Sequence, residues 1–340
     1  MSDITVFFAT NRNYLPDNKL AVFGSHFNPD GVAALRFGRA RYTRADKLPR
    51  LDSVEVYSEI KTEDGFAKQG SAAFLEDLRT AMKGERSDTL TFIHGFNVSF
   101  MGALEAGARL ASQVQVLGRP VNVVVFSWPS DGAAVPLMSY YSDREDARAS
   151  GAAIARAFLK LRDYVGGLPE EDYCNRRLHL LTHSMGAYVL RNGLQALISK
   201  DANNLVRLFD QIVLAAPDED DDAFEREEKL RLLPRIGRAV TLYFNPNDRA
   251  LIISDKTKAN PDRLGSDGPR MVDLLPKKVA LVDCRVVAAD GDRLAQHSYY
   301  VGSVAVSADM GAVLSGAEPS TIENRAYIDV ERAWRIIREI

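Results

Sequence analysis

Thr182-His183-Ser184-Met185-Gly186 is the stretch that decides the fold of this chain. An apolar run, residues 178–181, precedes it, and a run with helical spacing, residues 188–198, follows it. A strand, a sharp turn with a serine at its tip and then a helix are typical of a nucleophile elbow, which exposes the serine hydroxyl. Gly186 fits this turn because a side chain there would meet the preceding strand. Thr182 departs from the pattern, since glycine is the usual residue two positions before the serine.

The composition of the chain is that of an ordinary globular protein. Of its 340 residues, 46% are hydrophobic and 26% are charged, which allows a sizeable buried core. The net charge is −3, and lysine and arginine are scattered along the chain, so we expect no nucleic-acid partner. No run approaches the roughly 18 apolar residues of a membrane span, and the start lacks the regions of a signal peptide. The sequence therefore predicts a soluble, cytoplasmic protein.

The two cysteines lack the spacing of a metal site. Cys174 and Cys284 lie in different segments, whereas zinc ligands come in close pairs and a disulfide framework needs several cysteines. We therefore expect two free structural thiols, no metal and no cofactor.

From residue 88 onward, strand-like and helix-like runs alternate. This pattern predicts an α/β protein in which helices cover a mostly parallel sheet. Continuous apolar runs indicate buried strands at 90–93, 121–126, 178–181, 211–215, 240–244 and 279–287. Helical spacing or a capping signal predicts helices at 100–111, 142–165, 188–198, 223–236 and 329–340.

The first 87 residues read as an N-terminal β extension of the sheet. Strand-like runs at 5–9, 22–23, 34–42 and 54–60 are joined by polar turns. We expect residues 1–87 to form this extension and residues 88–340 the catalytic core, together making one structural domain. The strand-rich extension could also supply the interface of a homo-oligomer.

A serine hydroxyl becomes a strong nucleophile when a histidine takes its proton, and a carboxylate orients that histidine. Proteins with an elbow of this kind carry the three groups in the order serine, acid, histidine. Of the five histidines, only His297 follows Ser184, and a polar loop, residues 288–296, separates it from the strand at 279–287. His297 is therefore the predicted base.

Asp248 is the favoured acid. It directly follows the strand at 240–244, on a turn that Pro246 restricts, where a carboxylate can reach the base. Asp218 is the competing acid, because it also stands at a strand exit. It heads an acidic run, residues 218–222, whose simplest interpretation is a solvated loop at a helix N-terminus. A role for Asp218 in the triad and a calcium site in the run both stay open.

The oxyanion hole needs two backbone N–H groups. Met185, the residue after the serine, supplies the first, and Phe96 in the loop after the strand at 90–93 supplies the second. Gly95 lets the backbone approach there, and His94 braces the loop. His179 and His183 are predicted to be structural.

With these segments in place, the chain resembles the α/β-hydrolase superfamily over residues 88–340. More narrowly, it is similar to a bacterial family of esterase- and lipase-like α/β-hydrolases of unknown function. The resemblance rests on residues 8–12 (FATNR), 94–97 (HGFN), 126–132 (FSWPSDG), 182–186 (THSMG), 215–218 (AAPD), 247–251 (NDRAL) and 297–299 (HSY). It implies the α/β-hydrolase fold and a triad of Ser184, Asp248 and His297, and it implies no particular substrate.

Aromatic residues near strand ends are the candidates for the substrate pocket, because open α/β sheets bind ligands beyond the carboxyl ends of their strands. They are Trp128, Tyr140, Tyr141 and Tyr299. The insertions after the strands are short, so we expect no large cap domain and a partly open site for small or medium esters. The predicted function is a serine hydrolase that cleaves carboxylic esters through an acyl-enzyme. A thioesterase, an amidase, an acyltransferase and an inactive binding protein are the alternatives.

Overall fold

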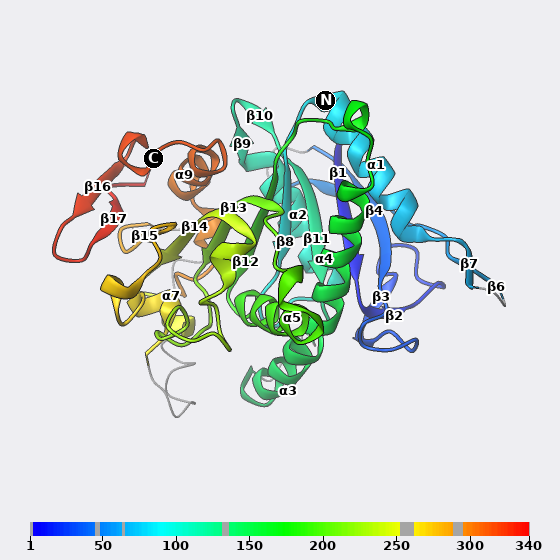
Figure 1. Cartoon of the computed structure of the whole chain (residues 1–340), viewed down its shortest axis with the longest axis horizontal. Helices are drawn as coiled ribbons and strands as arrows, with labels where there is room; N and C mark the ends of the chain where they lie inside the picture. Colours follow the sequence, from blue (N-terminus) through cyan, green and yellow to red (C-terminus); the bar gives the residue numbers. More distant parts are fainter. Residues whose placement is uncertain are drawn as a thin grey trace.

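The computed structural model describes residues 3–44, 48–62, 65–130, 136–251, 262–287 and 295–339. Its centre is an eleven-stranded sheet in the order β16-β17-β15-β14-β13-β12-β8-β11-β1-β4-β5 (Figure 1). All neighbours from β1 to β17 are parallel, and antiparallel strands are added at both edges, β4 and β5 at one and β16 at the other. The chain therefore has the mostly parallel α/β architecture that its sequence predicts.

The strands of this sheet coincide with the predicted apolar runs over most of the chain. They are β1 (Ile4–Thr10), β4 (Arg36–Thr43), β5 (Arg50–Val56), β8 (Thr89–Ile93), β11 (Asn122–Ser127), β12 (Leu178–His183), β13 (Phe209–Ala215), β14 (Gly237–Phe244), β15 (Val279–Asp283), β16 (Arg325–Ile328) and β17 (Ala333–Ile336). Three hairpins lie outside the sheet: β2 (Arg12–Tyr14) with β3 (Phe23–Phe27), β6 (Ile60–Thr62) with β7 (Gly65–Lys68), and β9 (Gln115–Val116) with β10 (Arg119–Pro120).

Helices cover both faces of the sheet and make two apolar cores. On one face lie α1 (Gly70–Glu85), α4 (Gly151–Gly166) and α5 (Gly186–Lys200), and on the other lie α2 (Phe100–Gln113), α8 (Tyr299–Gly302) and α9 (Val304–Leu314) (Figure 1). The central strands are buried on both sides, as residues along β1 show: Val6 and Phe8 enter one core, and Phe7 enters the other. Two-sided burial explains why these strands are continuous apolar runs in the sequence.

The N-terminal strands are built into the sheet. β1 pairs with β11 on one side and with β4 on the other. The sequence interpretation overlooked α1, although Phe74, Leu78 and Met82 are buried at the i, i+4 spacing of a helix face. It also left α8 and α9 unassigned.

Two predicted helices are wrong. Residues 223–236 form turns and a short 3-10 helix, η3 (Leu233–Arg235), and proline stands at the start of η3. The predicted C-terminal helix is the strand β17, which pairs with β15 and β16. The apolar spacing predicted a helix here, but Val330, which the helix would place on its apolar face, is 97% exposed. Pairing with the neighbouring strands determines the conformation instead.

The predicted helix at 142–165 is two helices, α3 (Pro136–Ala149) and α4, which meet at Ser150. Ser142 lies inside α3, so the capping signal there does not start a helix. A Cβ on Gly151 would lie 2.6 Å from the backbone carbon of Asn192, so α4 begins at a close approach to α5. Residues 131–135 of the preceding loop, which include part of the 126–132 motif, lie outside the described residues.

Candidate active site

Ser184 stands at the tip of the turn between β12 and α5. Its φ of 51° lies in the left-handed region, which is strained for a residue with a side chain. A Cβ on Gly186 would lie 2.4 Å from the carbonyl oxygen of Ile93, so only glycine fits there. A Cβ on Gly95 would lie 2.8 Å from Cβ of Ser184, which places the loop after β8 directly against the serine. The turn has the geometry of a nucleophile elbow.

The exit of the neighbouring strand holds this turn in place. The Ser184 N–H donates to the carbonyl oxygen of Ala215, the last residue of β13, at 3.1 Å. The Asp218 N–H in turn donates to the carbonyl oxygen of Ser184 at 3.1 Å. The strained serine is therefore fixed from both sides by backbone hydrogen bonds.

His297 and Asp248 are brought together across 49 positions of the chain. Nδ1 of His297 lies 2.7 Å from Oδ2 of Asp248, and the Asp248 side chain is wholly buried. The other carboxylate oxygen accepts the N–H of Leu251 at 3.1 Å, which fixes the orientation of the carboxylate just beyond β14. A proton on Nδ1 that is donated to Asp248 leaves the lone pair of the imidazole on Nε2.

His183 links the base to the elbow. Its Nε2 lies 3.1 Å from the carbonyl oxygen of His297, so Nε2 carries the proton and donates it. The two imidazole rings lie 4.6 Å apart, and the His183 ring stacks on Tyr300 at 4.3 Å. Burial and the neighbouring His297 hold the pKa of His183 well below its usual value. A neutral histidine next to Ser184 therefore holds the backbone of the predicted base.

The loop that carries Phe96 is held by polar side chains. The Asn97 N–H donates to Oδ2 of Asp143 at 3.1 Å, and the Val98 N–H donates to Oγ of Ser130 at 3.2 Å. The Ser130 hydroxyl itself donates to Asp143. These bonds fix the backbone around Phe96 beside Ser184.

Arg12 is the brace beneath this loop, and it was missed as a site residue by the sequence interpretation. Its side chain is buried and donates from Nη2 to the carbonyl oxygen of Val98 at 2.8 Å and from Nε to Oγ of Ser127 at 2.9 Å. Its position in the 8–12 motif was the available signal. Arg12, which follows β1, thus contacts both the loop after β8 and the last residue of β11.

His94 and Trp128 form a buried stack under the same loop. Their ring centroids lie 5.2 Å apart at an interplanar angle of 11°, and Nε1 of Trp128 donates to the carbonyl oxygen of His94 at 2.9 Å. Burial, together with the charge of Arg12, lowers the pKa of His94 to about 3. His94 lies in the bracing position that its sequence suggested.

Two predicted pocket residues are wrong. Trp128 has no exposed surface, because its ring lies under His94. Tyr299 is 1% exposed and donates its hydroxyl to the carbonyl oxygen of Tyr243 at 3.1 Å, so it packs in the core behind the base. Neither side chain can line an open pocket.

The other two candidates lie close to Phe96. The Tyr140 ring packs edge-on against Phe96 at 5.5 Å and against Tyr141 at 6.0 Å, and Tyr141 is 53% exposed. The Tyr140 hydroxyl donates to Oδ2 of Asp218 at 2.5 Å. Two aromatic side chains of α3 thus gather beside Phe96, on the loop that packs against Ser184.

The acidic run 218–222 is not a solvated loop, so that prediction is wrong. Four of its five side chains are buried, and cations pair with them. Arg191 contacts Glu219 at 3.1 Å, and Lys229 contacts Asp220 at 2.7 Å. Arg263, itself wholly buried, contacts Asp220 at 2.7 Å. Burial raises the pKa of Glu219. Arginine and lysine side chains thus supply positive charge to this run.

The remaining sequence predictions concern thiols, histidines and membrane spans. Cys174 and Cys284 are free, and His179 is buried 3.5 Å from Asp88. In the described part of the chain, every helix is too short or too polar to cross a membrane. The loop before the base, residues 288–296, lies outside the described residues as far as residue 294.

Comparison with solved structures gives distant likenesses. Aspergillus fumigatus lipase B is 11% identical over 74% of this chain, with a TM-score of 0.40, and the chain spans 57% of the length of lipase B. A Pyrobaculum calidifontis esterase is 14% identical over 90% of this chain and 86% of its own, with a TM-score of 0.38. Phospholipase PlaB from Legionella pneumophila is 16% identical over 64% of this chain and 43% of its own, with a TM-score of 0.26.

No curated protein matches the chain. A family model does: it covers residues 70–314, from α1 to the end of α9, and is described as an alpha/beta hydrolase of unknown function (DUF900). The match contains Ser184, Asp248 and His297 and spans most of the parallel sheet. The chain therefore belongs to this alpha/beta hydrolase family.

Proposed function

We propose that this protein hydrolyses carboxylic esters, with Ser184 as nucleophile, His297 as base and Asp248 as the acid that orients it. The observation that carries the proposal is the 2.7 Å contact between Nδ1 of His297 and the buried carboxylate of Asp248. His183 ties this pair to the strained turn at Ser184. The His297–Asp248 pair supports the roles of base and orienting acid.

In the proposed reaction, Oγ of Ser184 attacks the ester carbonyl while Nε2 of His297 takes the hydroxyl proton. The imidazolium forms beside the Asp248 carboxylate, which stabilises the new charge. His297 then gives the proton to the leaving alkoxide, and an acyl-enzyme forms on Ser184. Water attacks the acyl-enzyme with His297 again as base, which releases the carboxylic acid and restores the hydroxyl.

The backbone N–H groups of Met185 and Phe96 are the proposed donors to the oxyanion. Met185 is the N-cap residue of α5, and Phe96 stands on the loop that packs against Ser184 through Gly95. Bonds from Asn97 and Val98 to buried side chains hold that loop before any substrate arrives. Donors fixed in advance are the arrangement that stabilises a developing charge most strongly.

Phe96, Tyr140 and Tyr141 support an aromatic wall for the acyl group or the alcohol. The short insertions after the strands favour small or medium esters. A thioesterase, an amidase or an acyltransferase would use the same three residues. The leaving group distinguishes the first two from an esterase, and the acceptor of the acyl group distinguishes the acyltransferase. A catalytically inactive binding protein is the remaining alternative.

The test is labelling with a fluorophosphonate probe, followed by assays on p-nitrophenyl esters, thioesters and anilides. We expect labelling at Ser184, no labelling of Ser184→Ala, and a loss of turnover on the order of 10⁶-fold in Ser184→Ala or His297→Ala. Ser199→Ala, an exposed serine on α5, is the matched control. Failure of the folded native protein to react would favour the binding protein, and a Ser184→Ala variant that kept a tenth of the activity would refute the assignment.

A further inference from the structure

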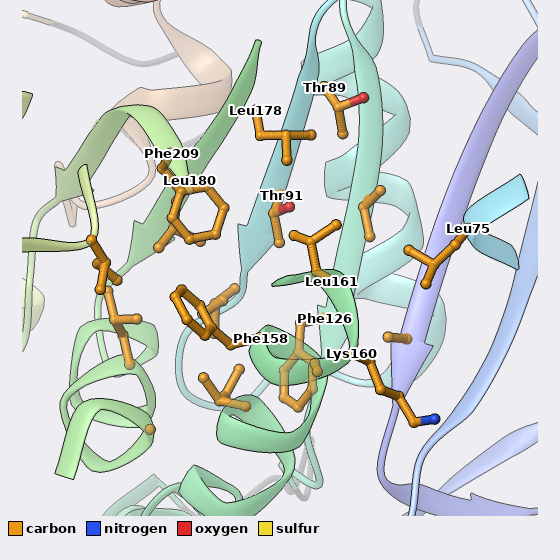
Figure 2. Close-up of a pocket in the computed structure, with 18 of the residues that line it drawn as sticks. Leu75, Thr89, Thr91, Phe126, Phe158, Lys160, Leu161, Leu178, Leu180 and Phe209 are labelled. Carbon is orange, nitrogen blue, oxygen red and sulfur yellow. The ribbon is translucent and has the colours of Figure 1, made fainter. Parts of the chain in front are cut away.

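A cavity away from the candidate active site lies between the sheet and the helices α1, α4 and α5. Its volume is about 110 Å³, and none of the residues proposed as catalytic lines it. Figure 2 shows its walls, in which sheet side chains face helix side chains. Representative members are Thr91, Phe126 and Leu180 from the sheet and Leu75, Phe158 and Leu161 from the helices.

The walls consist almost entirely of carbon. A cavity of this kind stays dry, and one of about 150 Å³ lined by similar side chains binds benzene or xenon. The lining atoms of an empty cavity lack contacts on one side, so an apolar occupant of matching size gains contacts with them. The shape and chemistry of the cavity fit a short alkyl chain.

A cation stands at one end of the cavity. Lys160, on α4, lies at the edge of the apolar group, and its Nζ donates to Oγ of the buried Ser71 at 3.0 Å (Figure 2). The same two residues and Phe37 line an adjoining polar hollow of about 270 Å³. Burial of the ammonium and the nearby charge of Arg156 lower the pKa of Lys160.

The polar hollow is lined by three cationic side chains and two acids. Its two acids, Asp30 and Glu59, both pair with Arg36, at 3.2 Å and 2.7 Å. Arg156 also lines the hollow and donates to the carbonyl oxygen of Ala33 at 3.3 Å. Among the described residues, neither Arg156 nor Lys160 makes an ion pair with a carboxylate. An anion in the hollow would supply that partner.

We propose that this cavity binds a short-chain fatty carboxylate, with its alkyl chain between the sheet and the helices and its head group beside Lys160. The alkyl chain of the ligand contacts the apolar side chains of the cavity wall. The carboxylate of the ligand pairs with the ammonium group of Lys160. The proposal does not depend on the chemistry at Ser184.

The first experiment measures binding to the full-length Ser184→Ala variant, so that the candidate active site consumes nothing. Hexanoate, hexanol and hexylamine are titrated by calorimetry. We expect hexanoate to bind most tightly and hexylamine most weakly. Lys160→Met should weaken hexanoate binding about tenfold, the effect of one charge-assisted hydrogen bond. It should change hexanol binding less than twofold. Lys200→Met, at an exposed lysine on α5, is the matched control and should change neither.

The second experiment fills the cavity from opposite walls. Ala157→Phe adds a ring from α4, and Thr91→Ile adds a methyl group from β8. Each folded variant, checked by circular dichroism, should lose binding of both hexanoate and hexanol. Absence of hexanoate binding to the parent would overturn the proposal. Unchanged hexanoate binding in a folded Ala157→Phe or Thr91→Ile variant would also overturn the proposal. An unchanged preference for hexanoate over hexanol in Lys160→Met would overturn it as well.

Discussion

His183 donates a hydrogen bond to the backbone of His297, so the residue next to the proposed nucleophile positions the proposed base. Loss of this donor frees the His297 backbone while its contact with Asp248 remains. We predict that His183→Leu lowers kcat about tenfold, the effect of one hydrogen bond of about 1.4 kcal/mol, with a smaller change in KM. His183→Gln, which keeps an N–H donor, should recover part of the loss. The measurement is steady-state kinetics on one ester, and His26→Gln, at an exposed histidine, is the control. A kcat of His183→Leu equal to the native value would contradict the positioning of His297 by His183.

The buried neutral state of His94 makes stability depend on pH. Its pKa is about 3 in the folded protein and about 6.5 in the unfolded chain, so the unfolded chain binds the extra proton between these values. The free energy of unfolding should therefore fall as the pH drops below 6.5. In His94→Gln, the slope between pH 6 and pH 4 should be shallower by about 1 kcal/mol per pH unit. Urea unfolding at several pH values measures it, and a slope that matches the native protein would rule out a neutral buried imidazole.

Arg12 satisfies several carbonyl oxygens beneath the loop that carries Phe96. A lysine at this position keeps the positive charge but lacks the planar guanidinium, whose N–H groups donate to these carbonyl oxygens at the same time. Arg12→Lys should lower the free energy of unfolding by about 2 kcal/mol and slow the reaction with fluorophosphonate at Ser184. Chemical denaturation and the labelling rate are the two measurements. A variant with lower stability and an unchanged labelling rate would show that Arg12 supports the fold without positioning the loop.

Two glycines should respond to alanine in opposite directions. Gly186→Ala forces a Cβ against the backbone oxygen of Ile93, so it should destabilise the protein by about 3 kcal/mol or prevent folding. A Cβ on Gly84, inside α1, meets no atom within 4 Å, and Gly84→Ala should stabilise the protein by about 0.5–1 kcal/mol. Thermal unfolding of both variants is the check, and equal shifts of Tm in the same direction would contradict the close approach at Gly186.

The contacts of the Tyr140 ring can be separated from the hydrogen bond of its hydroxyl. Tyr140→Phe removes the hydrogen bond to Asp218 and keeps the ring on Phe96, whereas Tyr140→Ala removes both. If the aromatic wall binds the acyl group, Tyr140→Ala should lower kcat/KM for butyrate esters about tenfold more than for acetate esters of the same alcohol. Tyr140→Phe should leave that ratio unchanged. An unchanged ratio in both variants would remove Tyr140 from the pocket.

Local patterns in the sequence predicted those parts of the fold that local patterns determine. β11 is a run of β-branched residues because both of its faces are buried, and the turn at Ser184 needs a glycine two residues later because a strand lies beneath it. The order of residues along the chain left His297 as the predicted base and favoured Asp248 over Asp218 as the acid, and the structure places Asp248 and His297 in contact.

Features that depend on distant neighbours could not be found in this way. Trp128 stands at a strand end like a pocket residue, and only the stack with His94 shows that it is buried. The acidic run 218–222 reads as a surface loop until Lys229 and Arg263 are seen to pair with it. The spacing of apolar residues at the C-terminus predicts a helix, but these residues form the strand β17, which pairs with β15 and β16. In each case a partner far away in the sequence determines the environment.

The position of β1 inside the sheet has a consequence for any shortened version of the protein. A fragment limited to residues 70–314, the region shared with the family, would lack β1, β4 and β5 as well as β16 and β17. β11 and β15 would then become open edges with unpaired backbone groups, and exposed apolar edges of this kind promote aggregation. The N-terminal strands therefore cover the β11 side of the sheet, and we expect soluble expression of residues 70–314 to require them.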